Sequence, residues 1–325
     1  MTQAGELSQA LLAGDRRALS KAITLVESTR EADRSAALEL LSRIGVTGEQ
    51  SFRIGVTGVP GAGKSTLIEA LGLHAIEAGK RVAVLAVDPS SQRSGGSVLG
   101  DKTRMTRLSG HAQAFVRPSP SLGVLGGTAG RTREVIGLCE AAGYDSILVE
   151  TVGVGQSEER VAAMVDCVLL LVLAGAGDEL SNMKRGLLES ADLIAFNKAD
   201  GDRARLVENE SAALRASLSI SRPHDAPAVL AVSAQEGNGV TALWRALLEQ
   251  HASARESGAL AARRGAQLRA WFDSALDEAL REVFVRRPDL LPARMAAEQS
   301  VESGASSPLE AAQRLVAGLL PTRKV

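Results

Sequence analysis

One short run of this sequence has the residue types and spacing of a phosphate-binding loop. Residues 58–65 read GVPGAGKS and match the pattern GxxxxGK[ST] in full. The glycines let backbone N–H groups turn towards phosphate oxygens, and the dipole of a helix that starts there favours negative charge. Lys64 is predicted to reach the β- and γ-phosphates of a nucleotide, and the Ser65 hydroxyl to bind Mg²⁺. The predicted phosphate-binding residues are Gly58, Val59, Pro60, Gly61, Ala62, Gly63, Lys64, Ser65 and Thr66.

A second motif, NKAD at residues 197–200, predicts which base the nucleotide carries. The Asp200 carboxylate can accept hydrogen bonds from the ring N–H and the exocyclic amine of guanine, whereas adenine would leave it unpaired. The Lys198 stem can lie over the base, and backbone N–H groups at 233–235 can meet the guanine carbonyl. The sequence therefore favours GTP over ATP. The predicted base-binding residues are Asn197, Lys198, Asp200, Ser233, Ala234 and Gln235.

Three carboxylates are candidates for the outer part of a Mg²⁺ site beside Ser65. Asp88 and Glu150 each end a short apolar run, and Asp101 lies near the end of the Gly-rich stretch 95–104. Glu150 stands where most P-loop proteins have Asp, and the longer acid can still reach the metal directly or through water. A helix cap is the alternative role for Asp88, and a solvated loop charge for Asp101.

The residue that positions the hydrolytic water is less clear from the sequence. Gly153 is predicted to contact the γ-phosphate. A Ras-like enzyme places a water-orienting Gln directly after that glycine, whereas this chain has Val154 there and Gln156 two residues later. We therefore expect slow intrinsic hydrolysis that a partner or a mobile loop accelerates.

These motifs follow short apolar runs that alternate with helical segments. Continuous Val, Leu and Ile runs indicate strands buried on both faces, and the alternation indicates an α/β fold with a mostly parallel sheet flanked by helices. In such sheets ligands bind beyond the carboxyl ends of the strands, where the motifs fall. A helix predicted over Ser65–Ala78 completes the context of a P-loop NTPase. The predicted strands are Ile54–Thr57, Val82–Val87, Ala114–Val116, Ser146–Glu150, Val168–Leu173, Leu193–Phe196 and Val229–Val232.

Helical segments are predicted on both sides of this central part. Residues 1–46 form an N-terminal helical extension, 47–251 the P-loop domain, and 252–325 a C-terminal helical arm. Within the arm, a helix predicted over 259–285 carries an apolar stripe that must pack against its own domain or against a second copy of the chain.

Composition excludes several classes of protein. The net charge of −1 and the eight aromatic residues argue against a basic nucleic-acid footprint and against a base-stacking protein. Only Cys139 and Cys167 are present, and no CxxC pair supports a disulfide framework or zinc ribbon. The start of the chain has no apolar signal-peptide core, and the longest apolar run, 167–176, is about half a membrane crossing. We expect a cytoplasmic protein without membrane or nucleic-acid partners.

Taken together, GVPGAGKS, VDPSS, GGSVLGDKTRM, ETVGVGQSE, GAGDEL and NKAD resemble the motif set of the MeaB/ArgK family of P-loop GTPases, relatives of the metallochaperone GTPases. The resemblance runs from about residue 7 to the C-terminus. It implies a homodimer formed through the C-terminal arm. It also implies a third switch, from Ala174 to Lys184, that carries the nucleotide state to a partner. The residues then predicted for catalysis are Lys64, Asp101, Gly153 and Lys184.

The same resemblance implies a partner. The family assists adenosylcobalamin-dependent acyl-CoA mutases, typically methylmalonyl-CoA mutase, by gating cofactor delivery and by protecting or rescuing the mutase. This chain has Ala174 and Ser181 where the family commonly has Pro and Gln, so a 2-hydroxyisobutyryl- or isobutyryl-CoA mutase is a further candidate partner. No DxHxxG-type stretch is present, so the cobalamin is expected on the partner, and GTP or GDP with Mg²⁺ on this chain.

Three other readings of the sequence remain open. A nickel-type metallochaperone would carry a His/Cys cluster, which four scattered His and two Cys do not suggest. A P-loop small-molecule kinase would have an acceptor pocket and no need for a guanine motif. A nucleotide-gated binding module would show negligible turnover.

Overall fold

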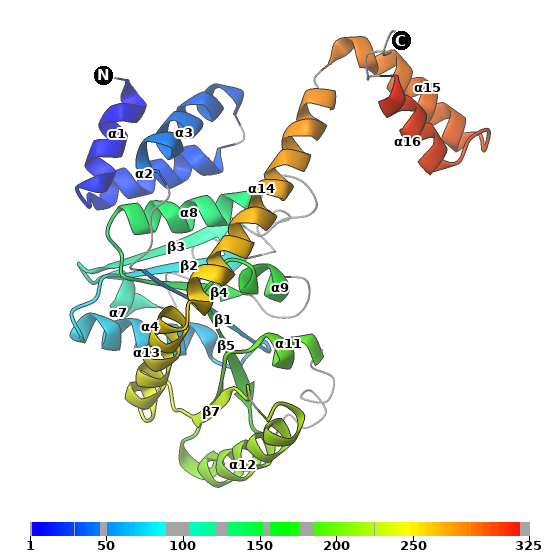
Figure 1. The fold of residues 1–325 in the computed structure, drawn as a ribbon. Helices are drawn as coiled ribbons and strands as arrows, with labels where there is room; N and C mark the ends of the chain where they lie inside the picture. The colour runs from blue at the N-terminus through cyan, green and yellow to red at the C-terminus, as the bar shows by residue number, and fades with distance from the viewer. Residues whose placement is uncertain are drawn as a thin grey trace. The chain divides into compact units, whose positions relative to one another are not determined.

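The computed structural model describes residues 2–28, 30–45, 51–88, 105–120, 129–151, 157–175, 185–223, 225–285 and 287–318. Its centre is a seven-stranded parallel sheet in the order β3-β2-β4-β1-β5-β6-β7, with helices on both faces (Figure 1). The predicted α/β fold class is thereby confirmed. The strands are β1 (Phe52–Gly58), β2 (Val82–Asp88), β3 (Ala114–Pro120), β4 (Ser146–Thr151), β5 (Cys167–Leu173), β6 (Leu193–Asn197) and β7 (Ala228–Ala231).

The central strands are buried on both faces, as their continuous apolar runs predict. All residues of β4 and β6 are buried, and so are six of the seven in β5. β1 lies between β4 and β5, with Val56 paired with Glu150 and Gly58 paired with Leu171. The chain segment that follows β1 therefore leaves the sheet near its middle, beside the carboxyl ends of two neighbours.

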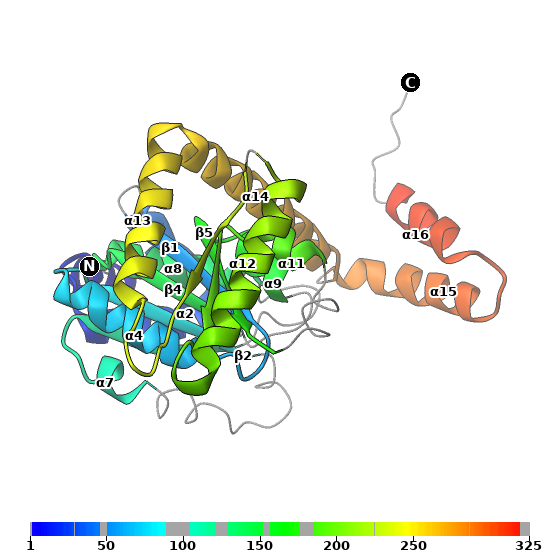
Figure 2. The ribbon, with the colours of Figure 1, turned by 90° about the horizontal axis from the view of Figure 1, so that it is seen from below.

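Helices cover each face of the sheet. On one face α4 (Lys64–Glu77) packs beside α13 (Val240–Glu256) and α7 (Thr106–Ser109), and their apolar residues share a core with β1 (Figure 2). On the other face α8 (Ala129–Ala141) and α9 (Ser157–Ala162) lie over β4 and its neighbours. A third core lies around β5 and β6, under α11 (Arg185–Ser190) and α12 (Ala204–Ser221).

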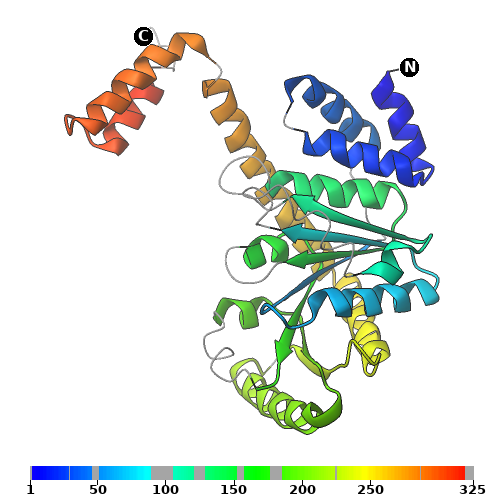
Figure 3. The ribbon, with the colours of Figure 1, turned by 180° about the vertical axis from the view of Figure 1, so that it is seen from behind.

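Three N-terminal helices, α1 (Gln3–Leu12), α2 (Arg16–Glu27) and α3 (Glu31–Ile44), pack on α8, which separates them from the sheet (Figure 3). The Asp15 carboxylate caps α2 by accepting hydrogen bonds from the backbone N–H groups of Arg17 and Ala18, and these bonds lower its pKa. An ion pair of 2.6 Å joins Glu27 at the end of α2 to Arg117 on β3. The N-terminal helices are therefore an integral layer of this unit.

The chain divides into two compact units, residues 1–268 and 269–325. Helix α14 (Ala259–Val285) has the bounds that the sequence predicts, and η3 (Pro288–Leu290), α15 (Leu291–Glu302) and α16 (Pro308–Ala317) follow it. Several apolar side chains of α14 are exposed, among them Phe272, Leu276, Leu280 and Val283. Of the helices in the described residues, none combines the length and apolar character needed to traverse a bilayer.

Candidate nucleotide-binding site

The loop between β1 and α4 is shaped by glycines that no other residue replaces without strain. Gly58 has φ 144°, and a Cβ there would lie 2.3 Å from the carbonyl oxygen of Leu171 on β5. Gly63 caps α4 with φ 87°, and a Cβ there would lie 2.5 Å from Nδ2 of Asn197. Because both glycines face neighbouring elements this closely, the loop is pressed against the ends of β5 and β6.

Lys64 is the first residue of α4, and its side chain returns over the loop. The residue is buried, and its Nζ donates hydrogen bonds to the carbonyl oxygens of Gly58 at 2.7 Å and Val59 at 3.1 Å. A buried ammonium group at a helix N-terminus provides the positive surroundings that phosphate oxygens need. The geometry fits the phosphate-binding role predicted for this loop.

Ser65 and Glu150 lie together although they are 85 residues apart in the sequence. The Ser65 hydroxyl donates a hydrogen bond of 2.7 Å to Oε1 of Glu150, and Glu150 is 7% exposed at the end of β4. Hydroxyl and carboxylate oxygens are the ligand atoms that Mg²⁺ prefers, so this pair fits the ion predicted here. The backbone of Asp88 ends β2 one strand further along, paired with Pro120.

The remaining predicted catalytic and metal residues lie outside the part of the chain that the structure describes. These are Asp101, Gly153 and Lys184, together with the side chain of Asp88. Among the described residues no group of three or more His, Cys, Asp or Glu side chains is arranged to hold a metal ion.

Asn197, the first residue of the NKAD motif, joins two loops. Its buried amide donates a hydrogen bond of 2.7 Å to the carbonyl oxygen of Ala62 and accepts one of 3.1 Å from the backbone N–H of Ala234. The phosphate loop and the loop after β7 are therefore fixed to each other through one side chain. Sequence reasoning placed Asn197 among the base-binding residues but did not foresee this bridging geometry.

The rest of the base motif meets the same loop. Ser233 is fully buried, and its hydroxyl donates a hydrogen bond to the Asp200 carboxylate while accepting one of 3.1 Å from the N–H of Glu236. Lys198 is exposed and has φ 61°, the only positive φ of a non-glycine residue among those described. Thr66 and Gln235 are also exposed. The structure thus brings together NKAD, residues 233–235 and the phosphate loop at one edge of the sheet.

A hydroxyl pair that sequence reasoning missed supports the same edge. Thr57 and Thr151 lie at the carboxyl ends of adjacent strands, and the single hydrogen of the buried Thr151 hydroxyl can be donated to Oγ1 of Thr57 at 3.1 Å or to the carbonyl oxygen of Val56 at 3.4 Å. Each threonine directly adjoins a predicted site residue, Gly58 or Glu150. The only available signal was a polar residue at the end of each apolar run.

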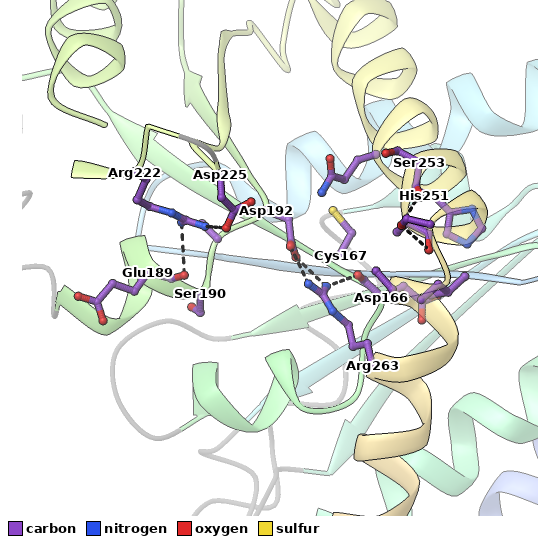
Figure 4. Close-up of a pocket in the computed structure, with 16 residues that line it drawn as sticks. Asp166, Cys167, Glu189, Ser190, Asp192, Arg222, Asp225, His251, Ser253 and Arg263 are labelled. Atoms are coloured by element: carbon purple, nitrogen blue, oxygen red, sulfur yellow. Dashed lines mark hydrogen bonds and ion pairs between the residues drawn. The ribbon is translucent and has the colours of Figure 1, made fainter. Parts of the chain in front are cut away.

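The opposite edge of the sheet contains a hollow of about 430 Å³ (Figure 4). Its guanidinium groups are already paired: Arg263 donates to both oxygens of Asp192 at 2.9 and 3.0 Å, and Arg222 donates to Asp225 at 2.6 Å. The Cys167 thiol lines it too, and burial raises its pKa well above the usual range. With its cations neutralised and its thiol protonated, this hollow lacks the chemistry of an anion site or of a nucleophilic centre.

Three comparisons match this chain to known proteins. The family model of the methylmalonyl-CoA mutase-associated GTPase MeaB matches residues 19–289. The chain is 44% identical to the mitochondrial methylmalonic aciduria type A homolog of Mus musculus, over 94% of this chain and 77% of that one. It is 47% identical to the GTPase ArgK of Escherichia coli, over 82% and 81%. The crystal structure of LAO/AO transport system kinase superposes with a TM-score of 0.74 at 35% identity, over 98% and 99% of the two chains.

Proposed function

The chain belongs to the family of methylmalonyl-CoA mutase-associated GTPases, and from that premise we propose that it is the GTP-hydrolysing chaperone of an adenosylcobalamin-dependent acyl-CoA mutase. In this proposal the GTPase gates delivery of the cofactor to the mutase, and it protects or reactivates the mutase. The cobalamin stays on the partner. The observation that best supports a guanine nucleotide is the bridge from Asn197 to Ala62 and Ala234, because it ties NKAD to the phosphate loop.

The residues of this chain divide the work of holding the substrate. The amides of the phosphate loop and the Lys64 ammonium would bind and neutralise the β- and γ-phosphates. Ser65 and Glu150 would hold Mg²⁺, with Asp88 and Asp101 as further candidate ligands. When bound, that ion supplies charge stabilisation to the transferring phosphoryl group. Asp200 would select guanine by accepting hydrogen bonds from its two donors.

The mutase would act on the rate of hydrolysis. Val154 stands where a Ras-like enzyme has a water-orienting Gln, which supports a low intrinsic rate. We propose that the segment from Ala174 to Lys184 carries the nucleotide state to the mutase, and that Gly153 and Lys184 take part in hydrolysis. Methylmalonyl-CoA mutase is the first candidate partner, since the family is described by that association.

We also propose that the protein is a cytoplasmic homodimer held by its C-terminal arm, residues 252–325. The support is the exposed apolar stripe of α14, where Phe272 is 64% exposed and Leu280 is 60% exposed. A stripe of this kind on a second copy would remove both surfaces from water.

The test is GTP hydrolysis by the purified full chain with Mg²⁺, alone and with increasing amounts of adenosylcobalamin-loaded methylmalonyl-CoA mutase. We expect a low basal rate that the mutase raises strongly. The same titration with an isobutyryl-type mutase distinguishes the two candidate partners. Tight GDP binding without activation by either mutase would contradict the chaperone role while leaving the GTPase activity intact.

A second candidate function is phosphotransfer to a small molecule, which the name of the solved relative suggests for that protein. The guanine motif and its hydrogen bonds do not favour it. Label from [γ-³²P]GTP that reached an organic acceptor rather than inorganic phosphate would support this alternative.

A further inference from the structure

A glutamate outside every motif holds the point where the chain leaves β5. The backbone N–H of Gly175 donates to both carboxylate oxygens of Glu210 on α12, at 3.0 and 3.2 Å. Gly175 has φ 85°, a conformation that favours glycine. Because the acceptor is ionised, this shared hydrogen bond is stronger than one to a neutral oxygen.

The helix that carries Glu210 is continuous with the base motif. A 3-10 turn, η2 (Gly201–Arg203), starts directly after Asp200, and the N–H of Arg203 donates to the Asp200 carbonyl oxygen at 3.1 Å. Helix α12 follows at Ala204 without a break. The backbone of Asp200 is thus joined to the first turns of α12 by regular structure, with no intervening loop.

The same helix packs on the end of β5. Val207 is buried in one core with Val172, Ala174 and Phe196. A Cβ built on Gly175 would lie 3.5 Å from Cδ2 of Leu206, so the helix runs close against this residue. The first turns of α12 thus contact both the strand that precedes NKAD and Gly175, the second residue of the 174–184 segment.

We propose that Glu210 is a positioning residue that couples the guanine-binding motif to Gly175, the second residue of the 174–184 segment, and so sets how strongly the mutase accelerates hydrolysis. The part concerning the mutase rests on the proposed function. The other part states that nucleotide binding at the base motif changes the environment of Gly175 through α12. Hydrogen exchange at the Gly175 amide tests this part without the mutase.

A purely structural role for Glu210 predicts a different result. The hydrogen bond to Gly175 is exposed to solvent, and such bonds contribute little to folding stability. Buried Val207 and Leu218 hold α12 on the core independently of it. Removing the carboxylate should therefore leave the Tm unchanged, and the GDP affinity and basal hydrolysis rate within about twofold of the parent. Only the acceleration by the mutase and the nucleotide dependence at Gly175 should change.

The experiment compares the full chain with Glu210→Ala, Glu210→Gln and the control Glu208→Ala, an exposed glutamate two residues earlier on the same helix. Acceleration by adenosylcobalamin-loaded methylmalonyl-CoA mutase is measured first. We expect a roughly tenfold loss in Glu210→Ala, corresponding to one charge-assisted hydrogen bond, and a smaller loss in Glu210→Gln, which keeps one acceptor oxygen. The control should match the parent.

Hydrogen exchange of the peptide containing Gly175 is measured second, with GDP and with a non-hydrolysable GTP analogue. The parent should show nucleotide-dependent exchange at this amide, and Glu210→Ala should lose that dependence. If the parent and Glu210→Ala are accelerated equally, the proposal about the mutase is overturned. If no mutase accelerates the parent, the proposed function fails and the exchange result alone decides the coupling. Equal exchange patterns in parent and variant, or no nucleotide dependence in the parent, overturn the coupling.

Discussion

The two ends of the parallel strands, here called the carboxyl edge and the amino edge of the sheet, are joined to the surrounding loops and helices by different interactions. At the carboxyl edge, hydrogen bonds from side chains to backbone groups join the loops, as with Asn197 to Ala62 and Lys64 to Gly58. At the amino edge, arginines and carboxylates form paired ion bridges. Arg264 donates to both oxygens of Asp166 at 2.8 and 2.6 Å, and Arg53 pairs with Glu140 at 2.6 Å.

This difference indicates that the carboxyl edge binds the ligand, whereas the amino edge stabilises the fold. Ion pairs that are satisfied within the protein have little electrostatic interaction left to offer a ligand, so the amino edge anchors the start of α14 through Arg263 and Arg264. At the carboxyl edge, hydrogen bonds to backbone carbonyl oxygens position the Lys64 ammonium beside the phosphate loop. We therefore predict that mutations at the carboxyl edge change nucleotide affinity, and that mutations at the amino edge change folding stability.

The largest expected effect is at the carboxyl edge. Lys64→Ala removes the buried ammonium group, and we expect the affinity for GDP and GTP to fall at least about 100-fold, the cost of roughly 3 kcal/mol for a lost charge-assisted contact. Isothermal titration with Mg²⁺ measures it. Lys80→Ala, an exposed lysine beyond the end of α4, is the control and should bind like the parent. Undiminished GDP affinity in Lys64→Ala would contradict the P-loop assignment.

At the amino edge the comparison predicts a loss of stability. The Asp166 side chain is 1% exposed and also accepts a hydrogen bond of 2.9 Å from the N–H of Arg53. Asp166→Asn leaves Arg264 without its carboxylate, and we expect the free energy of unfolding to fall by about 3 kcal/mol. Asp225→Asn breaks a pair whose carboxylate is 88% exposed, and it should cost less than about 1 kcal/mol.

Urea denaturation of both variants, with GDP affinity measured on the folded protein, checks this contrast. We expect the affinity of each variant to stay within about threefold of the parent. A larger loss of GDP affinity than of stability in Asp166→Asn would show that the two edges do not divide these roles.

A specificity change is expected from Asp200→Asn, since the second carboxylate oxygen becomes an N–H donor. Preference should move from guanine towards xanthine, with the ratio of GDP to XDP affinity falling by one to two orders of magnitude, about 1–3 kcal/mol. Competition against a fluorescent GDP measures the ratio, with ADP as a control that should stay weak in both proteins. Unchanged guanine selectivity would refute the base-binding role of NKAD.

The smallest effect concerns pH at the amino edge, where His251 stacks on Phe52 with ring centroids 4.3 Å apart. Burial lowers the pKa of His251 below its usual 6.5; nearby Asp166 opposes this shift, while Arg264 and Arg255 add to it. As pH falls through 6.5, the unfolded chain takes up this proton before the folded chain does. The histidine therefore contributes a loss of folding free energy on acidification.

His251→Phe keeps the ring stack and removes the titration. Its free energy of unfolding should fall less than that of the parent between pH 7 and pH 5, by urea denaturation at each pH. Parallel profiles for the two proteins would contradict this contribution from His251.

The elements were predictable because apolar runs report burial directly. All seven strands lie where the sequence predicts them, and the phosphate loop stands between a strand and a helix as expected. β3 is longer than predicted, since Pro118 and Pro120 argue against a strand. It is an outer strand of the sheet, paired on one side only, where a strand tolerates the missing N–H donor of proline.

The contacts between distant residues were not predictable. Arg263 and Arg264 read as part of a charged, solvated helix, because nothing local in a sequence reveals a carboxylate about 70 or 100 residues away. Asn197 was found through its motif, but its two bonds depend on strand order, which local patterns do not determine. Asp101, Gly153 and Lys184 keep their predicted roles as predictions, since the described residues do not include them.

The bridge made by Asn197 also sets an order of events during synthesis. It spans 135 residues back to Ala62 and 37 residues forward to Ala234. A growing chain on the ribosome presents its phosphate loop early, but the bridge closes only after the segment through residue 234 has emerged. A chain stalled or cut between NKAD and that point would carry the phosphate loop and Asn197 without the second bond, to Ala234. The bridge thus reserves the complete site for chains that have been translated through the whole sheet.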